Sequence, residues 1–277
     1  MRSLDNTLVI EAGKAQKLNL KELWLYRELL YFFAWRDIKV RYKQTALGAG
    51  WAILQPLLAA GIFTLFFNKV AKITSGASNV PYPIFAYLGL MYWNAFSGAL
   101  STVSNSLISN SGVINKIYFP RLIPPLSATA LSIVDFVFAL AVFFVLLIGF
   151  RIVPGVEGLL FIIPSLVLAM VSALAVGLFF AALNIRYRDV RSALPYLIQI
   201  TFFMTPVIYP ISYIPHRFQI FAYVNPATGA ISTVKAGLFH ESVNWAGLLI
   251  SWLTTLIIFW LGVRYFKRAE NKLPDYL

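Results

Sequence analysis

The feature that most constrains this chain is an abrupt change of composition within residues 36–56, which read RDIKVRYKQTALGAGWAILQP. The cations at its start are Arg36, Lys39, Arg41 and Lys43. No ionisable side chain follows between residues 51 and 67. Lipid phosphates attract juxtamembrane cations at roughly 1 kcal/mol each, and the indole of Trp51 suits the headgroup level. This stretch therefore predicts the point where the chain enters a membrane.

The overall composition supports the same interpretation. Apolar residues make up 59% of the chain, charged residues 12%, and the mean hydropathy is +0.74. A soluble chain of 277 residues with this composition would expose too much hydrocarbon to water. We therefore expect an integral membrane protein of the all-α class.

Charge and residue usage exclude several classes of function. The net charge is +12, but the cations flank apolar stretches and form no base-reading helix, so we expect no nucleic-acid partner. The chain has no Cys, which excludes disulfides. Its two histidines, His216 and His240, are too few and too far apart in sequence for a zinc site, so we expect no metal.

Six apolar segments are candidates to cross the membrane. Crossing ~30 Å of hydrocarbon takes about 20 helical residues. The predicted spans are residues 52–70, 84–107, 122–150, 159–183, 194–209 and 247–266. We therefore expect a polytopic domain of six transmembrane helices within residues 51–266, followed by a cytoplasmic tail at 267–277.

The segment before the first span has a different pattern. Residues 1–19 are polar and mixed, and we expect a mobile cytoplasmic tail. In residues 20–50 aromatic side chains such as Trp24 and Trp35 recur at helical spacing, with Lys21 and Lys43 opposite them. This pattern predicts an amphipathic interfacial helix. The alternative is a simple anchor on the lipid surface with no further role.

The distribution of Lys and Arg predicts the orientation. With a cytoplasmic amino terminus, the inner segments hold 18 of these cations and the outer loops hold 5. The outer cations are Lys69, Lys72, Arg151, Arg217 and Lys235. The positive-inside rule then places both termini in the cytoplasm.

Two cytoplasmic loops are candidate contact sites for a partner protein. Ser111 and Pro120 bound a predicted two-turn helix at residues 112–119. Its mixed apolar and basic surface is typical of a helix that seats in a groove of a partner. The predicted contact residues are Val113, Lys116, Ile117, Tyr118, Phe119 and Arg121. The alternative is a plain turn between spans.

The second such loop carries a run of charges. Its residues are Arg186, Arg188, Asp189 and Arg191. Such a run usually helps to set topology, and we expect Asp189 to pair with a neighbouring arginine at little net benefit.

Residues 205–239 are unlike a plain outer loop. Prolines divide them into apolar pieces that are too short to span a membrane, and Asn225 followed by Pro226 is a helix-start signal. Irregular backbone at membrane depth persists only where protein buries it or where it lines a cavity. We predict re-entrant half-helices that close the outer end of a conduit; the alternative is a helix pair lying flat on the bilayer. The candidate gate residues are Pro206, Pro210, Phe218, Phe221, Tyr223 and Pro226.

Polar groups within the spans are few. Asp135 lies at clear membrane depth, and we interpret it as internally paired, because no second acid accompanies it to form a proton relay. In the second span, aromatic side chains alternate with hydroxyls and amides, including Asn94, Ser97 and Ser101. Such a surface suits pyranose rings, whereas the alternative is interface anchoring and helix packing. The candidate substrate-path residues are Tyr87, Tyr92, Trp93 and Phe96.

Taken together, these motifs resemble a known family. They are RDIKVRYKQTALGAGWAILQP, NSGVINKIYFPRLIPP, LNIRYRDVR, TPVIYP and YVNPATG, in this order along the chain. The set is similar to the membrane subunit of ATP-binding cassette transporters that export polysaccharides. That resemblance implies a homodimeric permease in the bacterial cytoplasmic membrane with two nucleotide-binding subunits. It further implies a lipid-linked O-antigen, capsule or teichoic acid substrate, a coupling helix at residues 112–119, and gate helices in the proline-rich segment.

The residues also indicate that energy comes from a partner. The chain has no glycine-rich phosphate loop and no acid placed for Mg²⁺, so we expect ATP and Mg²⁺ to bind the partner subunit and no cofactor to bind this chain. A secondary transporter would show midplane coupling residues and an inverted repeat, which we do not find. A membrane glycosyltransferase or acyltransferase would need convergent acids or a histidine motif, which is also missing.

The cation asymmetry generates a topological prediction. Single Lys116→Cys and Arg188→Cys variants should be shielded from an impermeant thiol reagent in intact cells, whereas Arg217→Cys should be labelled. The natural lack of Cys removes background labelling. Labelling of position 116 from outside would reverse the orientation and with it the coupling assignment.

Overall fold

The computed structural model describes residues 20–43, 50–76, 80–187 and 189–270. Within these ranges every regular element is helical. In chain order they are α1 (Leu20–Leu25), α2 (Arg27–Lys43), α3 (Gly50–Phe63), the π-helix η1 (Thr64–Val70), α4 (Tyr82–Ser109), α5 (Ser111–Ile114), α6 (Ile123–Gly149), α7 (Val156–Arg186), α8 (Asp189–Met204), the 3-10 turn η2 (Ile211–Tyr213), α9 (His216–Val224), α10 (Pro226–Leu238) and α11 (Trp245–Glu270).

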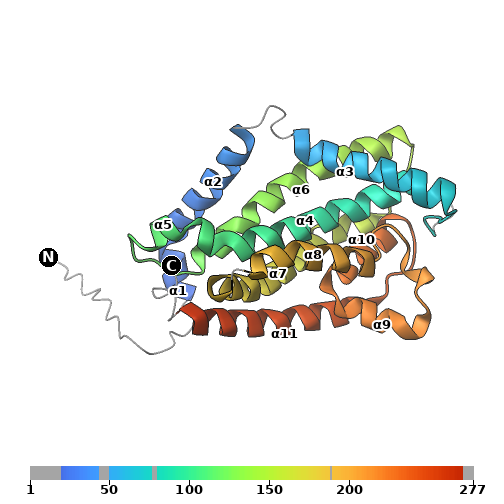
Figure 1. Cartoon of the computed structure of the whole chain (residues 1–277). Helices are drawn as coiled ribbons and strands as arrows, with labels where there is room; N and C mark the ends of the chain where they lie inside the picture. Colours follow the sequence, from blue (N-terminus) through green and yellow to red (C-terminus); the bar gives the residue numbers. More distant parts are fainter. Residues whose placement is uncertain (1–19, 44–49, 77–79, 188, 271–277) are drawn as a thin grey trace.

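Long helices packed side by side form the body of the molecule (Figure 1). Helix α4 is central: it packs against α6 on one side and against α7 on the other, and α7 also contacts α10 and α11. Short helices α1 and α5 lie at one end of this bundle, and α9 and α10 lie at the opposite end (Figure 1). The two ends therefore carry the loops that the sequence assigns to opposite sides of a membrane.

Four stretches of helix in the described residues are long and apolar enough to cross a membrane. They are Gly50–Val70, Ile123–Gly149, Val156–Arg186 and Trp245–Glu270. They confirm the all-α, multi-pass class. The other two predicted spans correspond to α4, which is rich in polar residues, and to α8, whose 16 residues extend only roughly 24 Å. The count of six spans stays a prediction.

The segment before the first span differs from a single amphipathic helix. It breaks at Tyr26 into α1 and α2. The apolar side chains of α2 are distributed all around the helix, so it has no separate apolar face. Helix α2 packs along α6, because Phe33 and Ala34 turn toward protein while Tyr31 and Trp35 remain exposed. Part of this segment therefore belongs to the protein core. Residues 44–49 near its predicted end, and the predicted tail at 1–19, lie outside the described residues. The predicted tail at 267–277 begins as helix, because α11 continues to Glu270, and residues 271–277 are not described.

Close backbone contact joins α10 to the start of α7. A Cβ added to Gly158 of α7 would lie 2.1 Å from the backbone nitrogen of Leu238 at the end of α10. Only glycine permits this approach, because a side chain would have to occupy space filled by main chain. Helix α10 is buried along nearly its whole length as a result, although it is too short to span a membrane.

Candidate functional site

A cavity of about 350 Å³ lies between the membrane helices. Helices α3, α4, α6 and α8 form its walls, and the end of α2 reaches it. Apolar side chains such as Met91, Phe136 and Ile198 line part of it. The polar groups that face it are Arg41, Gln55, Asn94, Ser97, Ser101 and Asp135.

Helix α4 supplies half of these polar groups because of its periodicity. Asn94, Ser97 and Ser101 follow one another at spacings of three and four residues, which places them on one helix face. Gly98 lies on the same face and leaves the cavity open beside them. Neutral donors and acceptors thus alternate along one wall of the cavity, an arrangement that suits hydroxyl-rich ligands.

Asp135 is paired within the protein, which confirms its predicted role. Its carboxylate lies 3.1 Å from the guanidinium of Arg41, and the hydroxyl of Tyr42 donates a second hydrogen bond to it. Burial, together with the bond to Asp135, raises the pKa of Tyr42, so this hydroxyl remains a donor. Asp135 is twelve residues into α6, roughly 18 Å along it. The partners come from α2, an element that the sequence placed at the membrane surface.

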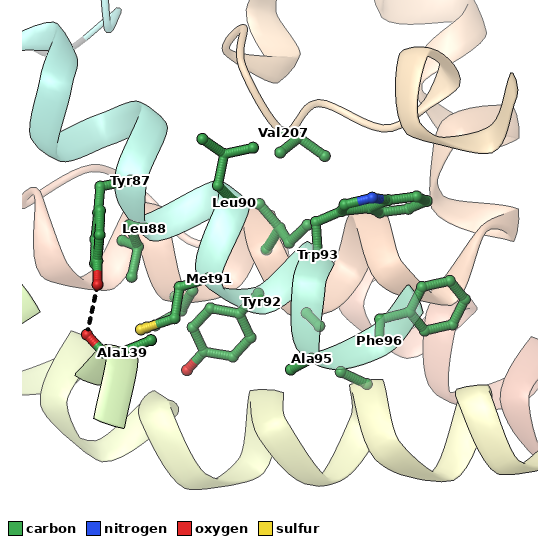
Figure 2. Close-up of a cluster of buried hydrophobic side chains, with 14 of the residues drawn as sticks. Tyr87, Leu88, Leu90, Met91, Tyr92, Trp93, Ala95, Phe96, Ala139 and Val207 are labelled. Carbon is green, nitrogen blue, oxygen red and sulfur yellow. Dashed lines mark hydrogen bonds between the residues drawn. The ribbon is translucent and has the colours of Figure 1, made fainter. Parts of the chain in front are cut away.

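The four aromatic residues predicted to line a substrate path are located elsewhere. Tyr87 and Tyr92 are fully buried, and Trp93 and Phe96 are 5% and 4% exposed. The hydroxyl of Tyr87 donates to the carbonyl of Ala139 at 3.0 Å, as Figure 2 shows, and that of Tyr92 to the carbonyl of Ile162 at 2.9 Å. These aromatic side chains hold α4 to α6 and α7.

This placement corrects the assignment of the cavity wall. The side chains of α4 that face the cavity are the small polar ones, Asn94, Ser97 and Ser101. The physical reason is that the large aromatic surfaces fill the spaces between helices, whereas small groups leave room for a cavity. The sequence carried this signal in the polar residues that separate the aromatic ones.

The predicted coupling helix is shorter than expected. Helix α5 ends at Ile114 after a single turn, and the chain is irregular from there to residue 120. At the end of this irregular stretch, Phe119 is 1% exposed and packs on Phe33 of α2 with ring centroids 5.8 Å apart. Phe119 is therefore unavailable to a partner protein.

The exposed part of this segment is a compact basic and apolar surface. Lys116, Ile117 and Tyr118 are exposed; we call these three residues the contact loop. Val113 and Arg121 are half-buried, and the backbone N–H of Arg121 donates to the carboxylate of Glu270 at 3.4 Å. The contact loop is thus attached to α11 on one side and, through Phe119, to α2 on the other.

The loop at residues 186–191, which the sequence predicts to lie on the cytoplasmic side, is exposed where the structure describes it. The guanidinium of Arg186 lies over the ring of Tyr187 at 5.1 Å, and Arg191 is also exposed. Asp189 is the first residue of α8, where a carboxylate stabilises the helix N-terminus. Arg188 lies outside the described residues.

The outer segment contains the helix start that the sequence predicts. Asn225 caps α10 by accepting a hydrogen bond from the N–H of Ala227 at 3.1 Å, and Pro226 is the first helical residue. Phe218 and Phe221 on α9 are exposed, with ring centroids 6.5 Å apart. Other predicted gate residues, Pro206, Pro210, Tyr223 and Pro226, are buried. Of the six candidate gate residues, Phe218 and Phe221 are therefore the two that are exposed.

A second cavity of about 500 Å³ lies at this outer end. Lys235 and Glu241 both border it. Burial raises the pKa of Glu241, and the charge of Lys235 partly opposes that shift. Burial lowers the pKa of Lys235, and the charge of Glu241 partly opposes that shift. Lys235 was counted above as a loop cation, but the structure buries it within α10.

The Arg41–Asp135 pair generates a prediction about stability. Asp135→Asn should destabilise the folded protein by roughly 1–2 kcal/mol, because Arg41 loses its counter-charge in a partly exposed site. The double variant Arg41→Gln with Asp135→Asn should lose less than the sum of the two single losses. Thermal unfolding in detergent measures this coupling. Strictly additive losses would show that the two charges do not interact.

Comparison with known proteins finds relatives that match this chain over nearly its whole length. A protein from Klebsiella pneumoniae named "O-antigen export system permease protein RfbA" is 27% identical over 262 residues, which cover 94% of this chain and 98% of the relative. A Myxococcus xanthus protein of the same name is also 27% identical, over 92% of this chain and 98% of its own. The Escherichia coli "Polysialic acid transport protein KpsM" is 20% identical over 93% of this chain and 96% of its own.

A family model decides the family assignment. The model described as "ABC-2 type transporter" matches residues 28–239, which include the cavity, the contact loop and the outer helices. The match covers well over half of the chain. This chain therefore belongs to the ABC-2 type transporter family of membrane proteins.

Proposed function

We propose that this chain is the permease subunit of an ATP-driven exporter that moves a lipid-linked polysaccharide, such as O-antigen, across the bacterial cytoplasmic membrane. The observation that carries the proposal is the polar cavity between α3, α4, α6 and α8 in a member of the ABC-2 family. The names of its relatives, which refer to O-antigen export and polysialic acid transport, supply the substrate class.

The chemistry of the cavity supports a sugar ligand. Asn94, Ser97 and Ser101 offer neutral donors and acceptors, and each exchanges hydrogen bonds with hydroxyl groups without a large desolvation cost. A polymer must slide through its conduit, so weak repeated contacts are preferable to one tight site. A second copy of the chain, facing α3 and α8, would enclose this wall and complete a conduit between two permease subunits.

The contact loop is the proposed docking site for the ATPase subunit. Ile117 and Tyr118 are 51% and 44% exposed, and Lys116 lies beside them. Exposed aromatic and aliphatic side chains in a basic loop suit a groove that has carboxylates at its rim. ATP and Mg²⁺ would bind that subunit, and this chain would supply the path through which motion reaches the membrane helices.

The outer helices are the proposed gate of the conduit. Phe218 and Phe221 form an exposed apolar pair on α9, while α10 is fixed inside the protomer. A movable short helix beside a fixed one is a suitable closure for a path that must not leak ions.

The experiment that tests energy coupling replaces the exposed anchors. Ile117→Ala with Tyr118→Ala should leave membrane insertion and the unfolding temperature unchanged, but should release the ATPase or separate ATP turnover from export. Each lost anchor typically costs ~2 kcal/mol of binding at an interface hot spot. Lys116→Ala should weaken binding less and with greater salt dependence, because it acts at the rim.

The neighbouring ring provides the matched control. Phe119→Ala removes a buried side chain and should destabilise the protein by about 3–5 kcal/mol. If the Ile117 and Tyr118 double variant exports polymer at the normal rate with its ATPase still bound, the contact loop is a connecting turn and docking occurs elsewhere.

A further inference from the structure

The chain between α8 and η2 contains a short irregular segment that is completely enclosed. Helix α8 ends at Met204, and Thr205 and Val207 are fully buried while Ile208 is 2% exposed. Pro206 is buried as well. We call residues 205–208 the joint. The carbonyl of Thr205 accepts a hydrogen bond from the N–H of Val207 at 2.7 Å, whereas the carbonyls of Pro206, Val207 and Ile208 have no backbone donor in the described part of the chain. A buried carbonyl without a hydrogen bond is costly.

Side chains from two distant helices supply the missing partners. Lys235 of α10 donates from Nζ to the carbonyls of Pro206 at 3.1 Å and Val207 at 2.7 Å. Tyr82 of α4 donates to the carbonyl of Ile208 at 2.6 Å. The carboxamide of Asn225, which also caps α10, donates to Thr205 Oγ1 at 2.7 Å. The joint is thus held by α4 and α10 together.

Lys235 is unusual among these partners because it brings an ionisable group into the interior, where burial lowers its pKa. It is 5% exposed, and its ammonium lies 3.6 Å from the ring centroid of Phe85. In the part of the chain that the structure describes, no carboxylate lies within ion-pair distance of it; Glu241 borders the same outer cavity without such contact. Two carbonyl oxygens and one aromatic face therefore compensate the buried ammonium.

The space around the joint fits this arrangement closely. A Cβ added to Gly89 of α4 would lie 2.2 Å from the carbonyl oxygen of Val207 and 2.9 Å from Lys235 Nζ. Main-chain atoms occupy that space, so a side chain at position 89 would push the joint away from α4. Gly89 and Lys235 therefore support the same contact: Gly89 leaves room for the carbonyl of Val207, and Lys235 donates a hydrogen bond to it.

The joint lies between two elements of the proposed transport path. On one side the chain continues into α8, whose Pro195 and Ile198 line the cavity between the membrane helices. On the other side it leads through Pro210 into η2 and α9, which carries the exposed pair Phe218 and Phe221. The joint is the covalent connection between the cavity wall and the proposed gate.

We propose that Lys235 is a positioning residue for the outer gate: by binding the carbonyls of Pro206 and Val207, its ammonium fixes the joint through which α8 and α9 are connected. The gating role rests on the proposed function, whereas the positioning of the joint does not. Loss of the side-chain amino group should release the joint locally, and α9 should then no longer keep its position relative to α8.

The test measures access to the joint in the full-length protein in membranes, without ATPase or polymer. Because the chain has no Cys, Ile208→Cys provides a single buried reporter. Adding Lys235→Met, which keeps the length of the side chain but removes its charge and its donors, should raise the rate of thiol labelling at position 208 by roughly tenfold or more. A second reporter, Ala173→Cys in the core of α7, should keep its labelling rate.

A steric variant keeps the test decisive if Lys235→Met fails to fold. Gly89→Ala should also accelerate labelling at position 208, because the new methyl group displaces the same joint. Gly149→Ala is its matched control, since a Cβ there meets no atom within 4 Å. Labelling at position 208 should be unchanged in this control.

Two results would overturn the proposal. One is labelling of position 208 at the unmodified rate in folded Lys235→Met and Gly89→Ala proteins. The other is an equal acceleration at positions 208 and 173, which would mean that Lys235 only stabilises the whole fold. Export assays on the same variants are read separately: if the parent protein exports no polysaccharide, the proposed function fails, while the labelling result still decides the role of Lys235.

Discussion

The structure depends on one constraint: a polar group in a hydrocarbon medium must find its partner within the protein. Tyr87 and Tyr92 satisfy it by donating to carbonyls of α6 and α7. The side-chain nitrogen of Asn184 does so by donating to the carbonyl of Ser104 at 2.8 Å, which joins α7 to α4, whereas its side-chain oxygen has no hydrogen-bond partner within the described residues. Interhelical hydrogen bonds of this kind typically contribute ~0.6–2 kcal/mol each, in addition to close packing. They make α4 the fixed centre to which the other helices attach.

The same constraint determines where side chains fill the interior and where a cavity remains. Large aromatic side chains of α4 fill the interior between the helices (Figure 2). The small polar side chains of α4 face the cavity instead. Asp135 and Arg41 compensate each other at the cavity, and Lys235 compensates irregular backbone at the outer end. Asp135, Arg41 and Lys235 thus each mark a contact between separate elements of the chain.

Much of this fold was predictable from local sequence, but the site was not. Apolar length predicted the long helices, Asn225 followed by Pro226 predicted the start of α10, and the isolation of Asp135 predicted its pairing. The roles of Tyr87, Tyr92 and Phe119 were assigned less well, because an aromatic side chain suits a sugar, a partner or a core equally. Which of these it meets depends on the helix opposite, and no local pattern specifies that. Lys235 resembled a loop cation for the same reason.

The central claim is that the wall formed by Asn94, Ser97 and Ser101 faces the polysaccharide during export. The most direct test places a photo-crosslinking amino acid at position 94 or at position 87 in cells that export the polymer. The account predicts ATP-dependent crosslinks to polysaccharide from position 94 and none from position 87, which is buried between α4 and α6. Crosslinks to polymer from the exposed position 148 of α6, with none from position 94, would contradict it.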